Sequence, residues 1–282
     1  MLKEAAKAIL KRRAVVQFQR TLYYGTADFI DSLLGRREEM VPPRRMIFIG
    51  GQDFKEVGEE FLRIFQEPGG LRPHHAVLDV GSGIGRMARP LTRFLDPSKG
   101  ARYEGFDITR SGVEWCRKNI SVKFPHFRFQ PVDLYNKIYN PKGATQARDF
   151  RFPFADGTFD FLFLTSVFTH MFPDDVNRYI SEIARVLKPG GRCLATFFIW
   201  NPESAGLVEA GKSSLLFPFE GKGYRHAVKY VPEEAIALPE KWVLDTFSRY
   251  GLDVQAPIHF GKWCGRASYL SFQDIVVSQK RA

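Results

Sequence analysis

Short apolar runs alternate with amphipathic stretches over most of the chain. Residues 77–80, 103–108 and 127–134 are largely β-branched, aliphatic or aromatic, and an acidic residue lies near the end of each run. Two further apolar runs, in 152–171 and 187–200, continue the series. Runs of this length and composition are typical of parallel strands that are buried on both faces. The pattern therefore predicts an α/β fold, with a doubly wound, mostly parallel sheet and helices on both of its faces.

Amphipathic segments flank these runs. Residues 56–70 predict a helix with Val57, Phe61, Ile64 and Phe65 on one face, which ends at a Gly-Gly pair. After Trp200 comes a stretch of about forty residues rich in Gly, Pro and Tyr. Because this stretch is too long for an ordinary connection, we expect a lid at about 201–238. A helix over 240–251 and two closing strands, 253–260 and 269–278, complete the prediction.

The most specific motif follows the first apolar run. The sequence VLDVGSGIGRMA places Gly81, Gly83 and Gly85 at alternate positions after Asp79. Glycines let a backbone turn sharply and approach a ligand, and a helix after them directs its first N–H groups at that ligand. Arg86 stands where a dinucleotide-binding G-x-G-x-x-G has its third glycine, so the spacing differs from that motif. It resembles motif I of the class I S-adenosylmethionine-dependent methyltransferases.

Acidic residues at the ends of the next two predicted strands support the resemblance. Asp107 lies about twenty residues beyond the glycines, where a carboxylate reaches ribose hydroxyls in βαβ nucleotide sites. Asp133 ends the third strand, where the family has an acid that accepts from the adenine amino group. Each acid alone is explained as well by a helix N-cap or a solvated strand end. Three acids on successive strands favour a crevice above a parallel sheet.

The resemblance covers roughly residues 71–200. It implies S-adenosylmethionine as the methyl donor, no metal, and a seven-stranded sheet whose last strand runs antiparallel. The donor-binding residues that it implies are Asp79, Gly81, Gly83, Gly85, Asp107, Ile108, Asp133, Leu134 and Thr165.

A candidate for proton transfer follows the fourth strand. The sulfonium methyl of the donor is already activated, so such an enzyme chiefly aligns the acceptor and excludes water. An alcohol acceptor also needs a base, and His170 in SVFTHM is the candidate catalytic residue. The alternative is a histidine that caps the fold or hydrogen-bonds to the backbone. His226 and His259 are lesser candidates.

Missing motifs narrow the acceptor. The fourth strand lacks the [DN]PP[YF] tetrapeptide of enzymes that methylate adenine or glutamine side chains, and the acid grouping of metal-dependent catechol methyltransferases is absent. Among the aromatic residues that crowd the lid and closing strands, Trp200, Tyr224 and Trp263 are the candidate acceptor contacts. We therefore predict methyl transfer to a small or medium-sized metabolite, at oxygen. The alternatives are a macromolecular, lipid-linked or carrier-linked glycan acceptor, and a non-catalytic S-adenosylmethionine-binding subunit.

Positive charge is concentrated at the start of the chain. The net charge is +10, and residues 1–45 hold ten Lys or Arg against five acids. Basic and apolar residues alternate between Leu2 and Arg20 as in a basic amphipathic helix. Three interpretations stay open: a helical cap on the enzyme, contact with a membrane surface, and attraction of an anionic acceptor. Nucleic acid is a weaker fourth, because no aromatic interleaving or RNA-binding module accompanies the charge.

Length and composition fit one α/β domain with an extension. We predict an N-terminal helical extension over 1–70 and a methyltransferase domain over 71–282 that contains the lid. No apolar run is long enough to span a bilayer and no signal-peptide pattern is present, so we expect a cytoplasmic protein. Cys116, Cys193 and Cys264 are widely spaced, which predicts reduced thiols and no zinc site. The sequence does not predict an oligomeric state.

Overall fold

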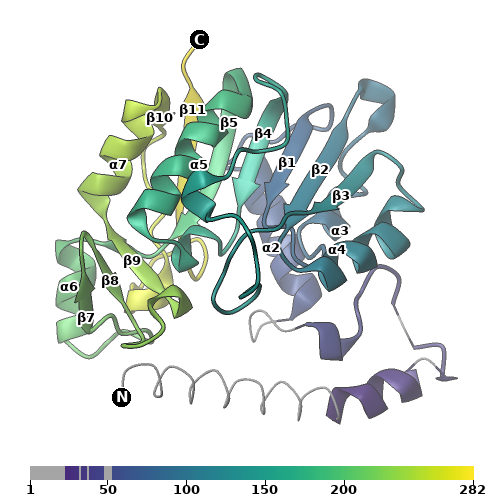
Figure 1. Cartoon of the computed structure of the whole chain (residues 1–282), viewed down its shortest axis with the longest axis horizontal. Helices are drawn as coiled ribbons and strands as arrows, with labels where there is room; N and C mark the ends of the chain where they lie inside the picture. Colours follow the sequence, from purple (N-terminus) through teal and green to yellow (C-terminus); the bar gives the residue numbers. More distant parts are fainter. Residues whose placement is uncertain (1–22, 32, 37, 48–52) are drawn as a thin grey trace.

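The computed structural model describes residues 23–282 except 32, 37 and 48–52, and it shows a large sheet between two helical layers with a small sheet beside it (Figure 1). The predicted basic helix up to Arg20 and the glycine pair Gly50–Gly51 lie outside the described residues. No helix in the described part of the chain is long and apolar enough to cross a membrane. The three cysteines are free and buried.

The large sheet has seven strands in the order β10-β11-β5-β4-β1-β2-β3. Neighbours from β5 through β3 are parallel, whereas β11 is antiparallel to both β5 and β10 and lies between them. This topology confirms the predicted doubly wound, mostly parallel sheet with an antiparallel last strand. The strands are β1 (Ala76–Val80), β2 (Arg102–Asp107), β3 (Phe127–Pro131), β4 (Phe159–Leu164), β5 (Leu187–Phe197), β10 (Leu252–Val254) and β11 (Asp274–Lys280).

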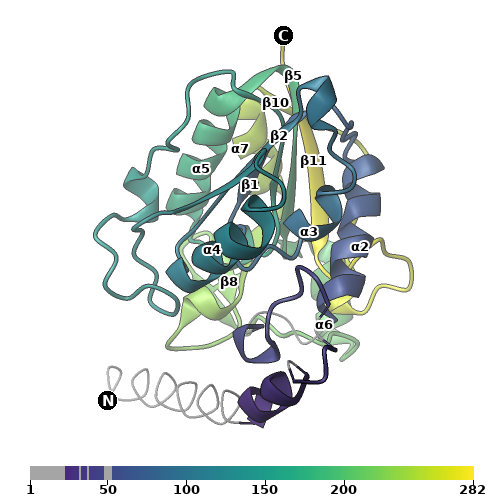
Figure 2. The same ribbon diagram turned by 90° about the vertical axis from the view of Figure 1, so that its right-hand side faces the viewer.

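Helices cover both faces of this sheet, as predicted (Figures 1 and 2). On one face lie α5 (Pro173–Val186) and α7 (Glu240–Arg249), and on the other lie α2 (Phe54–Gln66), α3 (Ala88–Leu91) and α4 (Arg110–Cys116), which a π-helical turn, η3 (Arg117–Ser121), continues. The predicted apolar face of α2 is buried, and the Phe65 ring stacks 4.3 Å from that of Phe163 in β4. The Asp53 side chain begins α2 by accepting hydrogen bonds from two of its first N–H groups.

Several strands are shorter than the sequence predicted. The third strand ends at Pro131, not at Leu134, because proline has no N–H to extend the ladder. The run 187–200 divides, with β5 ending at Phe197 and the next two paired residues joining the small sheet. The predicted closing strands 253–260 and 269–278 are β10 and β11, whose bounds are narrower.

Each closing strand is interrupted by a competing set of contacts. After Val254 the chain reaches Pro257, which cannot donate a ladder bond. Residues 271 and 272 instead accept hydrogen bonds from the backbone N–H groups of Lys262 and Trp263, at 3.1 Å each.

The small sheet occupies the predicted lid. Its strand order is β6-β9-β8-β7, and the Asn201 side chain caps the helix that follows β6. The elements are β6 (Ile199–Trp200), α6 (Pro202–Glu209), β7 (Phe219–Gly221), β8 (Tyr224–His226), the 3-10 turn η6 (Pro232–Glu234) and β9 (Ile236–Pro239). The other 3-10 turns are η1 (Arg44–Met46), η2 (Pro97–Lys99), η4 (Ala147–Asp149), η5 (Phe168–His170) and η7 (Lys262–Cys264). The predicted boundary at residue 70 stays a prediction, although α2, which precedes it, packs on the large sheet.

Candidate active site

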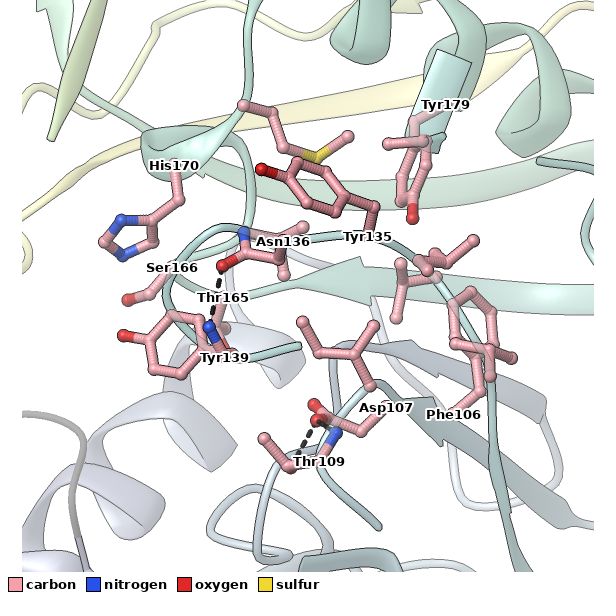
Figure 3. A pocket seen from close by; sticks show the side chains of 18 residues that line it. Phe106, Asp107, Thr109, Tyr135, Asn136, Tyr139, Thr165, Ser166, His170 and Tyr179 are labelled. Atoms are coloured by element: carbon pink, nitrogen blue, oxygen red, sulfur yellow. Dashed lines mark hydrogen bonds between the residues drawn. The ribbon is translucent and has the colours of Figure 1, made fainter. Parts of the chain in front are cut away.

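A pocket opens at the carboxyl ends of three neighbouring parallel strands, β4, β1 and β2 (Figure 3). This is where ligands bind in open α/β sheets. Most of its wall is aliphatic or aromatic, with a few polar groups. The lining residues are Val80, Gly81, Phe106, Asp107, Ile108, Thr109, Val132, Leu134, Tyr135, Asn136, Tyr139, Ala147, Thr165, Ser166, Val167, His170, Met171 and Tyr179.

Asp107, at the end of β2, presents the carboxylate of this pocket. Its Oδ2 accepts from the Gly83 N–H at 2.7 Å, and its Oδ1 accepts from both the N–H and the hydroxyl of Thr109. Burial raises the pKa of this carboxyl, while the donors from Thr109 and Gly83 lower it. A carboxylate has about four lone-pair positions, so Asp107 retains capacity for a ligand hydroxyl.

The glycine loop forms the wall between β1 and Asp107. Gly81 has a φ of +87°, and a Cβ there would lie 2.5 Å from Cγ2 of Val167. Gly83 has a φ of +54°, and a Cβ there would stand in open space. Gly81 lines the pocket, whereas Gly83 and Gly85 do not. The helix that the sequence places after Gly85 begins only at Ala88 and has a single turn.

Asp79 lies behind this wall and is 1% exposed. Its Oδ2 accepts a hydrogen bond from the Tyr103 hydroxyl, while its buried Oδ1 has no partner among the described residues. Burial raises the pKa of this carboxyl to about 8. The site therefore holds two nearby buried carboxyls, of which Asp107 faces the pocket.

The third predicted acid does not reach the pocket wall. The Asp133 side chain is exposed and accepts hydrogen bonds from Asn140 Nδ2 at 3.2 Å and from the Ala144 N–H at 3.4 Å. Its neighbour Leu134 does line the pocket, as do Ile108 and the predicted Thr165.

His170 lies at the end of η5, half-buried, on a different side of the pocket from Asp107 (Figure 3). Its Nδ1 is 2.8 Å from the carbonyl oxygen of Glu233 in η6. Because a carbonyl oxygen only accepts, Nδ1 must carry the hydrogen, and in the neutral ring Nε2 then holds the lone pair. The Tyr139 ring meets the imidazole edge-on at a centroid distance of 6.4 Å.

The segment between β3 and β4 supplies lining residues that sequence reasoning missed: Tyr135, Asn136 and Tyr139. Asn136 Oδ1 accepts from the N–H groups of Ile138 and Tyr139 and holds the loop in a turn. A signal existed, because parallel strands need a long crossover and this one shows no helical periodicity. Such a connection beside the strand ends is commonly a binding loop.

Ser166 was also missed. It has a φ of +57°, a conformation that is rare for residues other than glycine. The Thr196 hydroxyl accepts its N–H at 2.8 Å, and its own hydroxyl donates to Gln273 Oε1 at 3.2 Å. Strands β5 and β11 thus hold Ser166 in a strained turn at the pocket wall.

The three candidate acceptor contacts lie outside the pocket wall. Trp263 is fully buried, and its indole N–H donates to Asp274 at 2.7 Å. Trp200 and Tyr224 are half-buried on the small sheet. The Arg225 guanidinium lies 4.7 Å from the centre of the Trp200 ring, and the Tyr224 ring contacts that of Phe172.

Residues 78–195 match the family described as a methyltransferase domain, and this range holds the glycine loop, Asp107 and His170. The chain carries a class I S-adenosylmethionine-dependent methyltransferase domain. A phthiotriol/phenolphthiotriol dimycocerosates methyltransferase of Mycobacterium ulcerans is 32% identical over 120 residues, which are 43% of this chain and 36% of that protein. A demethylmenaquinone methyltransferase of Thermus thermophilus is 28% identical over 58% of this chain and 67% of that protein.

The chain spans less than half the length of the first curated relatives that it matches. Among solved structures, protein PH0226 of Pyrococcus horikoshii matches with a TM-score of 0.56 and 18% identity, over 84% of this chain and 95% of that chain. This likeness shows a common fold.

The residues of the methyltransferase domain fit S-adenosylmethionine, the cofactor of this family. Asp107 offers a carboxylate for ribose hydroxyls, and the open space beside Gly83 leaves room for a ligand close to the backbone. Ile108 and Leu134 offer apolar surfaces for a purine ring. The unsatisfied Oδ1 of Asp79 adds a buried acid near a strand end, which suits an ammonium group.

Proposed function

We propose that the chain transfers the methyl group of S-adenosylmethionine to a hydroxyl oxygen of a small or medium-sized metabolite, and that His170 accepts the hydroxyl proton. The observation that carries this proposal is the hydrogen bond from His170 Nδ1 to the Glu233 carbonyl. It fixes the tautomer whose Nε2 accepts a proton, in a histidine that lines the same pocket as Asp107.

When bound, S-adenosylmethionine supplies an electrophilic methyl group. The protein's residues have three further tasks: to hold the acceptor in line, to exclude water and to take up the proton. The apolar lining, which includes Met171 and Tyr179, excludes water and favours an acceptor with an apolar body. As the acceptor oxygen gains the methyl group it loses its proton, which passes to Nε2 of His170.

In this proposal the segment 201–238 is the lid of the site. Two hydrogen bonds join it to the pocket residues: His170 Nδ1 donates to the Glu233 carbonyl, and Lys137 Nζ donates to the Tyr230 carbonyl at 3.0 Å. Trp200 and Tyr224 lie on the same small sheet. We propose that they contact the distal part of the acceptor.

A lipid acceptor is the second candidate. The largely apolar pocket wall favours it, and relatives named for phthiotriol dimycocerosates, demethylmenaquinone and a sterol support it. Turnover of one hydroxyl compound carrying alkyl chains of increasing length separates the two candidates. A rate that rises with chain length favours the lipid.

Two substitutions should separate binding from chemistry. His170→Ala should lower turnover by about a hundredfold or more, because the proton loses its acceptor, and should leave donor affinity nearly unchanged. Asp107→Ala should weaken binding of S-adenosylmethionine and S-adenosylhomocysteine by about tenfold or more, because it removes charged hydrogen bonds to the ligand. Calorimetric titration measures affinity, and turnover is assayed with a panel of alcohols and phenols.

His259→Ala is the matched control, because that histidine does not line the pocket. A turnover that survives His170→Ala would remove the base from the proposal. If the wild-type protein bound neither donor nor product, the proposed activity itself would be refuted.

A further inference from the structure

The first described helical segment presents an apolar face to solvent. Residues 23–31 are helical, and the Leu34 N–H continues the pattern by donating to the Ile30 carbonyl. In this segment, termed the 23–34 segment, Tyr23 is 76% exposed and Leu33 is 71% exposed. Half of the large apolar side chains that are exposed in the described part of the chain lie here: Tyr23, Phe29, Ile30, Leu33 and Leu34.

The polar side of the same segment faces the protein. Asp28 is 3% exposed, and its carboxylate accepts from the N–H groups of Arg44 at 2.7 Å and Arg45 at 3.2 Å. Asp31 forms an ion pair with Arg44 at 3.1 Å. A surface helix of a globular protein ordinarily has the opposite arrangement, with its apolar stripe inward. The 23–34 segment is therefore held by its acids and leaves its apolar face uncovered by the described residues.

The position of this face places it near the pocket. Strand β11 runs antiparallel to β1, β2 and β4 and ends close to the C-terminus, so the pocket lies at the opposite end of the sheet. Figures 1 and 2 both show the 23–34 segment at that opposite end, beside the small sheet. A partner that covers the apolar face would thus lie on the side from which an acceptor enters.

Charge indicates the nature of that partner. Residues 1–22 carry six basic residues (Lys3, Lys7, Lys11, Arg12, Arg13, Arg20) and one acid, Glu4. The exposed acids that follow the apolar face are paired, Glu38 with Lys55 and Glu39 with Lys123. An apolar face next to a cationic stretch is complementary to an anionic lipid surface, where aromatic and aliphatic side chains enter the interface and cations meet the headgroups.

We propose that the 23–34 segment docks the protein on an anionic lipid surface, with Ile30 and Leu33 entering the interface. Docking at this place brings the pocket to the surface in which an apolar acceptor would be dissolved. The binding itself does not depend on methyl transfer, so it can be tested without donor or acceptor.

Vesicle flotation with the full chain tests the proposal. Wild-type protein should float with vesicles of phosphatidylglycerol and phosphatidylcholine, and much less with phosphatidylcholine alone. The double substitution Ile30→Glu/Leu33→Glu should lower the bound fraction at least about tenfold, because burial of one such side chain already contributes about that factor. Neither residue packs in the described cores, so the variant should keep the wild-type unfolding midpoint.

Val122→Glu is the matched control. Val122 is 75% exposed on another part of the surface, so its replacement should leave vesicle binding unchanged. Failure of wild-type protein to bind anionic vesicles would overturn the proposal, as would equal binding by the double variant. Light scattering without lipid supplies a further test: a dimer that Leu33→Glu dissociates would assign the face to a second copy of the chain.

Discussion

Two buried carboxylates at the same edge of the large sheet have opposite surroundings. Asp274, the first residue of β11, accepts hydrogen bonds from the N–H groups of Ile199 and Gly261 and from the indole of Trp263, and it pairs with Arg266 at 3.2 Å. Asp79 in β1 has a single donor, the Tyr103 hydroxyl, and one unsatisfied oxygen. Strands β4 and β5 separate the two strands that carry them.

The two carboxyls also differ in protonation. Burial raises the pKa of Asp274 only to about 6, because four donors favour its charged form, whereas burial raises the pKa of Asp79 to about 8. A buried carboxylate with its full set of partners joins elements, and here it fastens the small sheet to β11. A buried carboxyl that lacks partners beside a pocket is available to a ligand.

Removal of the satisfied carboxylate should have the largest effect on stability. Asp274→Ala leaves the buried Arg266 without its carboxylate and orphans two backbone N–H groups. We expect the free energy of unfolding to fall by about 3–5 kcal/mol. Denaturant unfolding measures this change. Asp253→Ala, which breaks an exposed pair with Arg281, is the control and should remain close to wild type.

Removal of the unsatisfied carboxyl should have the opposite sign. The pKa of Asp79 is about 8 in the folded protein, against about 3.9 in an unfolded chain. Over this pH window the folded state holds a proton that the unfolded chain releases, so the free energy of unfolding falls as pH rises. Asp79→Asn cannot titrate, and it should be more stable than wild type at pH 8 by on the order of a few kcal/mol.

Urea unfolding at several pH values across this window provides the measurement for Asp79→Asn. Near its acidic end the variant and the wild type should have similar stability, since both side chains are neutral there. A wild-type stability that does not fall towards pH 8 would show that Asp79 ionises normally. Calorimetry on the same variant should show weaker donor binding, because the acid near the strand end is gone.

The smallest expected effect tests the role of Trp263. Trp263→Phe keeps an aromatic ring in the core and removes one hydrogen bond to Asp274, so stability should fall by about 1–2 kcal/mol. Donor affinity should be unchanged in a calorimetric titration. A large loss of donor affinity with normal stability would place Trp263 in the donor site and remove the distinction between the two carboxylates.

The sequence predicted the central part of the fold because the signals there are local. Buried parallel strands have a characteristic composition, and Asp79 and Asp107 follow from the motif and the spacing of the strands. Asp133 shows the limit of such reasoning. Its strand was extended by two residues of suitable composition, yet Pro131 ends the ladder and the chain turns outward.

The acceptor side was not predictable in the same way, because its contacts join distant parts of the sequence. Lys137 and Tyr230 are 93 residues apart, and His170 and Glu233 are 63 residues apart. Neither pair shows a periodicity or motif. The inverted orientation of the 23–34 segment likewise depends on Asp28 meeting Arg44, which the pattern of that segment alone does not reveal.

The position of β11 has a consequence for synthesis of the chain. Residues 274–280 are the last described strand to leave the ribosome, yet they lie between β5 and β10. Until they emerge, one edge of β5 keeps unpaired backbone groups, which other nascent chains can pair with. The glycine loop and β2 are complete long before that moment, whereas Asp274 and its partners come together only at the end. During translation the donor half can therefore form first, and the junction that supports the lid closes last.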